Sequence, residues 1–375
     1  MTAQRKAEIV GAGFAGLAAA CALAQRGWKV RVHERADRLR AAGAGIYIYE
    51  NGLRVLEALG AYDAAVATAP IAHTREVRDE NDRLLSLHRW DRSSRVFSIV
   101  RLQVIHALAA AAVRAGAEIV TGSEGVAATM EGCLTLATGE VVEADLIVAA
   151  DGVNSSLRDS VGLLETRRKL PDGATRLLIE ATAEEMQTDG GTTVEYWSGS
   201  RRILYTPCSG NTIYIALTML DRDETAKAVP IDARLWTRWF PHLSDLMLRM
   251  GGEARYDRFE YVKLKRWAAG RVVVLGDAAH ALPPNIGQGA GCAMMNALAL
   301  GVFLDQHADI GEGLAAWEKS ERPITDHTQR VSLFLGLPTT WPAFLRRGFF
   351  QLAGRSKWLI RQRTRTAHHR PTGTY

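Results

Sequence analysis

The sequence EIVGAGFAGLAAA, from Glu8 to Ala20, sets the expected fold. Its apolar start predicts a buried strand, and the G-x-G-x-x-G spacing of Gly11, Gly13 and Gly16 predicts a tight turn that leads directly into a helix. The first glycine allows the turn, the second lets the main chain approach a pyrophosphate, and the third lets helix and strand pack closely. The N-terminus of that helix offers unpaired N–H groups to phosphates.

A second apolar run, at 28–32, follows the helix and ends at Glu34. An acidic residue about twenty positions after the glycines is placed to bind a ribose hydroxyl. Together these features predict a dinucleotide-binding βαβ unit. The alternative is a glycine-rich helix start that binds no ligand.

The bulk composition is that of an ordinary globular chain. Its 375 residues allow two domains, or one large domain with an inserted sheet. The net charge of +5 mildly favours anionic partners, but nucleic acid is not an expected one. The four cysteines form no C-x-x-C pair, so we expect a reducing compartment and neither a metal site nor a disulfide framework. No apolar run reaches the ~18 residues of a membrane span, and we expect a cytoplasmic protein.

Periodicity and turn residues predict the remaining elements. Asn51 is expected to cap a helix over 52–59, and Gly116 to close a helix over 102–114. A helix over 231–250 is expected to break at Pro241. A hairpin is expected to join 75–77 to 84–87. Antiparallel strands are expected at 175–182, 192–197, 201–206 and 212–219.

Two further apolar runs end in polar motifs. The run 145–150 leads to Asp151-Gly152, and the run 271–275 leads to Gly276-Asp277 and then to a loop rich in proline and glycine. Such runs are typical of central parallel strands that end in loops above a site.

In this order the three motifs resemble those of the single-component FAD-dependent aromatic hydroxylases, which have the p-hydroxybenzoate hydroxylase fold. Residues 43–47, 202–208, 288–294 and 322–326 look like those of family members that oxygenate hydroxypyridine carboxylates. The resemblance implies an α/β fold, in which a Rossmann-like FAD-binding domain of the glutathione-reductase type carries an inserted antiparallel sheet-plus-helix substrate domain. The implied boundaries are 1–170 and 266–330 for the FAD domain, 171–265 with part of 45–100 for the substrate domain, and 331–375 for a basic helical tail.

The resemblance also implies the chemistry. NADH or NADPH would reduce FAD, O2 would add at flavin C4a, and the hydroperoxide would hydroxylate an electron-rich ring. We expect a monomer or homodimer. The cofactor-binding residues that the resemblance implies are Gly11, Gly13, Phe14, Ala15, Gly16, Glu34, Arg35, Arg40, Arg101, Val126, Asp277, Gly287, Gly289 and Ala290. His280 matches a family histidine, but a structural role is at least as good an interpretation.

The expected substrate is a hydroxylated aromatic or N-heteroaromatic acid, of the hydroxypyridine or hydroxybenzoate type. A hairpin centred near Cys208 would place Arg202 opposite Tyr214, where a guanidinium suits a carboxylate and a phenol suits a ring oxygen or nitrogen. The resemblance adds Tyr47 and Pro284 to this catalytic set. The alternative is a surface arginine and a core tyrosine.

Other functions stay open at this point. They are ring opening of a 3-hydroxypyridine carboxylate, alkene reduction or epoxidation on the same fold, and hydroxylation of a quinone ring by a protein whose basic tail binds a membrane surface.

Overall fold

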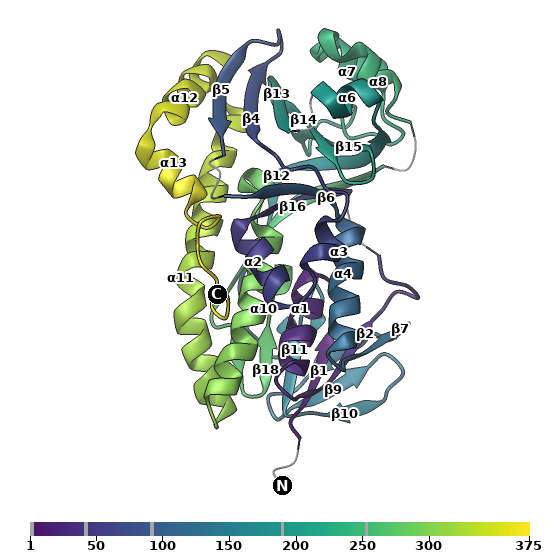
Figure 1. Ribbon diagram of the computed structural model, residues 1–375, viewed down its shortest axis with the longest axis vertical. Helices are drawn as coiled ribbons and strands as arrows, with labels where there is room; N and C mark the ends of the chain where they lie inside the picture. The colour runs from purple at the N-terminus through teal and green to yellow at the C-terminus, as the bar shows by residue number, and fades with distance from the viewer. Residues whose placement is uncertain (1–3, 41–43, 91–93, 189–190, 252–253) are drawn as a thin grey trace.

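The computed structural model describes residues 4–40, 44–90, 94–188, 191–251 and 254–375. Gly43, in one of the stretches that carry the family resemblance, lies outside them. Two layered units make up the molecule, one below the other in Figure 1. The lower unit is built on a six-stranded sheet with the order β17-β18-β11-β1-β2-β7. Its strands are β1 (Lys6–Val10), β2 (Lys29–Glu34), β7 (Glu118–Thr121), β11 (Leu146–Ala149), β17 (Ala268–Ala269) and β18 (Val272–Val274).

All neighbouring strands of this sheet run parallel except β17, which pairs antiparallel with β18. The helix α1 (Phe14–Ala24) is buried along its whole length, against α4 (Arg101–Arg114) and α10 (Gly289–Gln306). Its small side chains allow this, because Gly301 of α10 lies so close to Ala22 that a Cβ there would come within 3.0 Å. The predicted helix over 102–114 is confirmed, with Gly116 after its end at φ +101°.

The upper unit is a seven-stranded sheet with the order β16-β12-β15-β14-β13-β4-β5. Pro241 separates two helices beside it, as predicted, because it begins the short 3-10 helix η1. Trp236, Phe240 and Met247 of this region are fully buried in a second core. The strands are β4 (Thr74–Asp79), β5 (Leu84–Arg89), β12 (Leu164–Glu180), β13 (Thr192–Ser198), β14 (Arg201–Cys208), β15 (Thr212–Leu220) and β16 (Arg255–Leu264). The helices are α6 (Ala183–Thr188), α7 (Ala233–Trp239), η1 (Pro241–Leu243) and α8 (Ser244–Leu248).

Smaller elements complete the two units. One helix cap was predicted wrongly: α2 begins at Glu50, and Asn51 lies inside it, fully buried. The Asn51 amide donates to Gln288 Oε1 at 3.0 Å and to Met295 Sδ at 3.0 Å, so tertiary packing replaces the capping role. The smaller elements of the two units are β3 (Gly45–Tyr49), α2 (Glu50–Ala58), α3 (Tyr62–Val66), β6 (Val96–Val100), β8 (Gly125–Ala128), β9 (Cys133–Leu136), β10 (Val141–Glu143) and α5 (Ser156–Ser160).

The C-terminal part of the chain connects the two units along one side (Figure 1). After α9 (Asp277–His280) and η2 (Pro284–Ile286), the long helix α11 (Ile310–Gly336) rises beside the lower unit, so the expected tail boundary at 331 falls inside it. It leads through η3 (Leu337–Thr340) to α12 (Ala343–Arg355) and α13 (Lys357–Thr364), and α12 contacts β5. Within the described residues, no helix is both long and apolar enough to cross a membrane.

Candidate functional site

The three sequence motifs meet at one edge of the parallel sheet. Gly11 follows β1, Glu34 ends β2, Asp151 follows β11, and Asp277 lies just beyond β18. The carboxyl ends of parallel strands form the usual ligand-binding edge of an open α/β sheet. Contact between the first and last motifs is direct, because a Cβ on Gly276 would come within 2.9 Å of the Ala15 side chain. Segments more than 250 residues apart thus form a single corner.

The glycines of the first motif have different surroundings. Gly11 has φ +102°, and a Cβ there would overlap the carbonyl oxygen of Ala150. A Cβ on Gly16 would overlap the Gly11 carbonyl oxygen. Gly13 differs, because a Cβ there would meet nothing within 4 Å. Packing within the protein therefore explains why positions 11 and 16 require glycine. It leaves open space in front of Gly13 at the start of α1, where a pyrophosphate fits.

Glu34 closes the other side of the glycine turn. Its carboxylate accepts hydrogen bonds from the backbone N–H groups of Ala12 at 2.9 Å and Ala36 at 3.0 Å. A carboxylate can accept about four hydrogen bonds, so two sites stay available to ribose hydroxyls. The side chains of Arg35 and Arg40 are exposed on the same loop, and Val126 is 36% exposed on β8.

Arg101 and Asp277 are two charged candidates for cofactor binding at the centre of the site. The Arg101 guanidinium lies over the Phe14 ring, 5.2 Å from its centroid, and its buried Nε has no hydrogen-bond partner. The Asp277 side chain is accessible, yet desolvation raises its pKa while Arg101 and Arg176 act in the opposite direction. An unsatisfied guanidinium N–H beside the Phe14 turn provides a donor for an anionic or hydroxylated cofactor.

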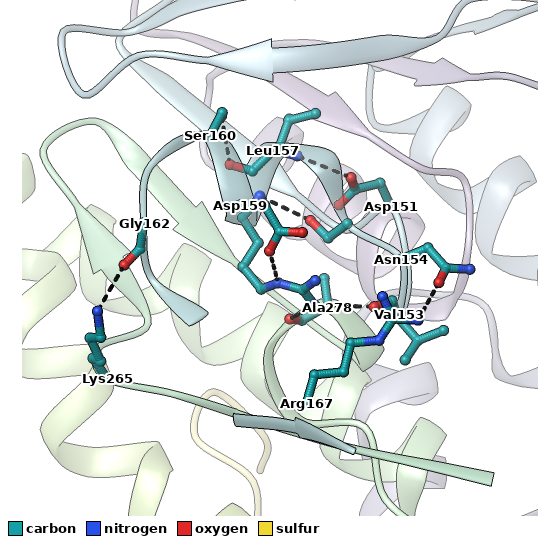
Figure 2. Close-up of polar contacts among 12 residues, drawn as sticks. Asp151, Val153, Asn154, Leu157, Asp159, Ser160, Gly162, Arg167, Lys265 and Ala278 are labelled. Carbon is teal, nitrogen blue, oxygen red and sulfur yellow. Dashed lines mark hydrogen bonds and ion pairs between the residues drawn. The ribbon is translucent and has the colours of Figure 1, made fainter. Parts of the chain in front are cut away.

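The Asp151-Gly152 loop is joined to this corner by a residue that the sequence reasoning missed. Figure 2 labels Asp151, Val153 and Ala278 around this contact. Arg158, fully buried in α5, donates to the carbonyl oxygens of Val153 at 3.1 Å and Ala278 at 3.2 Å. Asp151 accepts a long hydrogen bond from the Leu157 N–H, at 3.4 Å, and burial raises its pKa. Arg158 therefore joins the second motif to the third, and no local pattern in the sequence indicates it.

The loop after α9 presents backbone donors toward the same region. Pro284 is exposed at the start of η2, and Gly287 ends η2 in the left-handed conformation, with φ +64°, against the Tyr49 ring. The helix α10 then begins at Gly289, with Ala290 in its first turn and no side-chain cap. Its free N–H groups and dipole favour negative charge nearby, as on a reduced flavin.

The predicted pairing of Arg202 with Tyr214 is wrong. Arg202 lies opposite Thr218, and Tyr214 lies opposite Thr206. The hairpin turns around Gly210, which has φ +71°, rather than around Cys208, because left-handed residues are placed there. Arg202 and Tyr214 do share a face of the sheet, but they lie four positions apart along the strands.

Arg202 is buried and already neutralised. Its guanidinium contacts Asp172 at 3.2 Å and Glu195 at 3.5 Å, and it donates to Asn285 Oδ1 at 3.1 Å. The ring of Trp197 lies beneath it, with 4.8 Å between the guanidinium carbon and the ring centroid. Burial raises the pKa of Asp172, and Arg202 lowers it. The arginine thus links the sheet to η2.

The tyrosines gather at the other end of this face. The Tyr47 hydroxyl contacts the Thr206 hydroxyl, and burial raises the Tyr47 pKa. Tyr214 is 6% exposed and packs so closely on β3 that a Cβ on Gly45 would overlap its ring. Tyr47 and Tyr214 therefore come together near Thr206, away from the arginine.

Two adjoining cavities lie between the sheet, η2 and the tail, and they share Arg75, Asn285 and Arg363. Arg75 is ion-paired with Glu195. The side chain of Arg363 in α13 makes no hydrogen bond to the described residues. Burial and Arg75 lower its pKa to about 10, and Tyr49 and Glu195 act in the opposite direction. It therefore stays charged at neutral pH. The sequence reasoning missed it because it is one of many basic residues in the tail.

Comparisons with known proteins show which family the chain belongs to. The family model described as "FAD binding domain" matches residues 5–320. A probable 2-heptyl-3-hydroxy-4(1H)-quinolone synthase of Rhodococcus erythropolis is 40% identical over 374 residues, covering 98% of this chain and 97% of that protein. A 2-heptyl-3-hydroxy-4(1H)-quinolone synthase of Mycobacteroides abscessus is 41% identical over 359 residues, covering 94% and 95%.

Among solved structures, the tetrameric form of 2-methyl-3-hydroxypyridine-5-carboxylic acid oxygenase superposes with a TM-score of 0.89 at 38% identity, covering 100% of this chain and 98% of that one. This likeness confirms the expected α/β fold, with its FAD-binding domain and inserted sheet. Within the described ranges, no group of three or more His, Cys, Asp and Glu side chains could hold a metal ion. The chain belongs to the FAD-binding domain family, among its flavoprotein monooxygenases.

Proposed function

We propose that this chain hydroxylates the ring of an N-heteroaromatic substrate of the 4-quinolone type, with NADH or NADPH as electron donor and O2 as oxidant. When bound, FAD supplies the redox and oxygen-transfer chemistry. The names of its relatives at 40% and 41% identity describe a 4-quinolone with a hydroxyl at carbon 3 and a heptyl chain at carbon 2. That similarity supports the ring type, and the charges in the cavity support it independently.

The observation that carries the proposal is the neutralisation of Arg202. Two buried carboxylates, Asp172 and Glu195, balance the two guanidinium groups of Arg75 and Arg202. Among the described residues that line the two cavities, Arg363 is then the positive charge for which no ion pair is found. The carbonyl oxygen of a 4-quinolone, which carries partial negative charge, can accept hydrogen bonds from this guanidinium. An acid that also carried a phenolate would bring two negative charges to one unpaired cation.

The proposal gives the FAD-facing residues their roles. The open space before Gly13 would hold the pyrophosphate, and the free acceptor sites of Glu34 would bind ribose hydroxyls. Asp277 and Arg101 would bind the ribityl and phosphate region, and the N-terminus of α10 at Gly289 would stabilise negative charge on the flavin ring. The chain's own contribution is to bind, orient and exclude water.

A second candidate function is oxygenation of a hydroxypyridine or hydroxybenzoate carboxylate, by hydroxylation or by ring opening. The structural match to the pyridine-carboxylate oxygenase favours it. In that case Arg202 would exchange one of its protein carboxylates for the substrate's.

One assay separates the two functions. The FAD-loaded protein is incubated with NADH or NADPH and either 2-heptyl-4(1H)-quinolone or 2-methyl-3-hydroxypyridine-5-carboxylate. We expect the quinolone to gain one oxygen atom by mass spectrometry and to accelerate flavin reduction. The proposal is wrong if only the acid is oxygenated while the quinolone yields peroxide. Loss of the ring absorbance would identify ring opening.

A further inference from the structure

We propose that α12 and α13 complete the substrate site by forming an apolar chamber for a linear hydrocarbon arm on the substrate ring. This inference rests on the proposed ring hydroxylation, and it assigns the specificity for the arm to the C-terminal helices. The arm chamber is defined by residues from β4, α11, α12 and α13. They are Val77, Leu335, Phe349, Phe350, Ala353 and Ile360.

The chamber is continuous with the candidate catalytic loop. Its cavity is lined by Arg202 and Asn285, which contact each other, and by the apolar side chains of α12, with the Ser86 hydroxyl beside Gly354. Asn285 directly follows Pro284 in η2 and also lines the second cavity, together with Ile286 and Gln288. Because one cavity is lined both by Asn285 of η2 and by the apolar side chains of α12, a substituent on a ring held near η2 can extend to α12 within it.

The side chains that α12 contributes select for hydrocarbon. Phe349, Phe350, Ala353 and Gly354 line the cavity from this helix, and none of them carries a polar side-chain atom. The Phe350 ring packs edge-on against Trp197, with 5.0 Å between centroids, and lies 5.7 Å from the Phe349 ring. These α12 side chains offer dispersion contacts and no hydrogen bond, so they favour a hydrocarbon arm over a polar one. The Ser86 hydroxyl lies beside Gly354 in the same lining.

The chamber is held in a fixed position on the sheet. Arg347 of α12 contacts Asp79 at 3.1 Å and Glu80 at 2.8 Å. Arg346, 2% exposed, donates to the Gly199 carbonyl oxygen. These ion pairs and hydrogen bonds join the helix to β4 and to the turn after β13. A preorganised chamber binds a flexible arm with little further ordering of the protein.

A substrate series tests the inference directly. The FAD-loaded wild-type protein is assayed with 4(1H)-quinolones that carry methyl, propyl, pentyl, heptyl or nonyl at carbon 2. We expect kcat/KM for ring hydroxylation to rise about fourfold for each added methylene until the arm fills the chamber. Ring hydroxylation that is insensitive to arm length would overturn the inference and leave the proposed function intact. Absence of ring oxygenation at every length would overturn the proposed function.

Two opposite substitutions locate the chamber. Ala353→Trp fills it, and we expect the ratio of kcat/KM for heptyl over methyl to fall at least about tenfold. Phe350→Ala enlarges it, and we expect the preferred arm to become longer. The matched control is Leu352→Trp on the same helix, because Leu352 is 71% exposed and does not line the cavity. FAD content and melting temperature show whether each variant is folded. Equal ratios in the wild type and both chamber variants would place the arm elsewhere.

Discussion

Replacing Gly13 by alanine separates a role in cofactor binding from a role in folding. Gly13 precedes α1 with φ −84° and ψ −172°, a backbone conformation that any residue adopts. A Cβ there meets nothing within 4 Å, so the protein itself gives no reason for a glycine. We expect the unfolding free energy of the Gly13→Ala apoprotein to lie within about 1 kcal/mol of the wild-type value, as for other substitutions that create no clash.

FAD binding is expected to respond differently. A methyl group forced against the pyrophosphate resembles an overpacked contact, which costs about 1–3 kcal/mol. At about 1.4 kcal/mol for each factor of ten, the dissociation constant rises roughly 5- to 150-fold. Flavin fluorescence on titration of the apoprotein measures it. In the control Gly16→Ala, the new Cβ overlaps the Gly11 carbonyl oxygen, so the apoprotein itself should lose stability. Wild-type FAD affinity in Gly13→Ala would refute the assignment of this space to the cofactor.

Three further predictions concern single side chains. Arg202→Gln leaves the Asp172 carboxylate without its partner, so we expect the unfolding free energy measured in urea to fall by about 3–5 kcal/mol. Adding Asp172→Asn should restore part of the loss. An unchanged unfolding free energy in Arg202→Gln would contradict the ion pair. Burial lowers the pKa of His280 to about 4, below its unfolded value of about 6.5, so the unfolded chain binds more protons and stability is lost as pH falls from 6.5 toward 4. This loss, about 2 kcal/mol from that group between pH 7 and pH 4.5, should be absent in His280→Asn when urea unfolding is compared at the two pH values. Cys133 is the cysteine that is not buried, so a thiol reagent should label it alone in the native protein, as mass spectrometry of labelled peptides can check.

Much of the fold could be predicted because its signals are local. The glycine spacing before α1, the apolar runs that become β11 and β18, and the break at Pro241 each depend on neighbours within a few residues. The convergence of the motifs also follows from a rule, since parallel strands bring their carboxyl ends to one edge. The prediction that Asn51 caps a helix was wrong because residues distant in the sequence, Gln288 and Met295, supply its hydrogen-bond partners.

The substrate side could not be predicted in the same way, because long-range pairing decides which charges are free. Seen in the sequence, Arg202 is an unpaired cation on a strand, whereas in the structure β12 brings Asp172 and β13 brings Glu195 to it. Arg363 shows the reverse: it lies in a tail with many basic residues, and the return of α13 to η2 places it in the cavity with no ion pair to the described residues. A guanidinium can bind an anionic ligand only if the protein's own carboxylates do not already neutralise it, and the tertiary structure decides which carboxylates lie near it. The choice between an acid and a neutral ring therefore depends on how the sheet and the tail pair their charges, which no motif in this chain records.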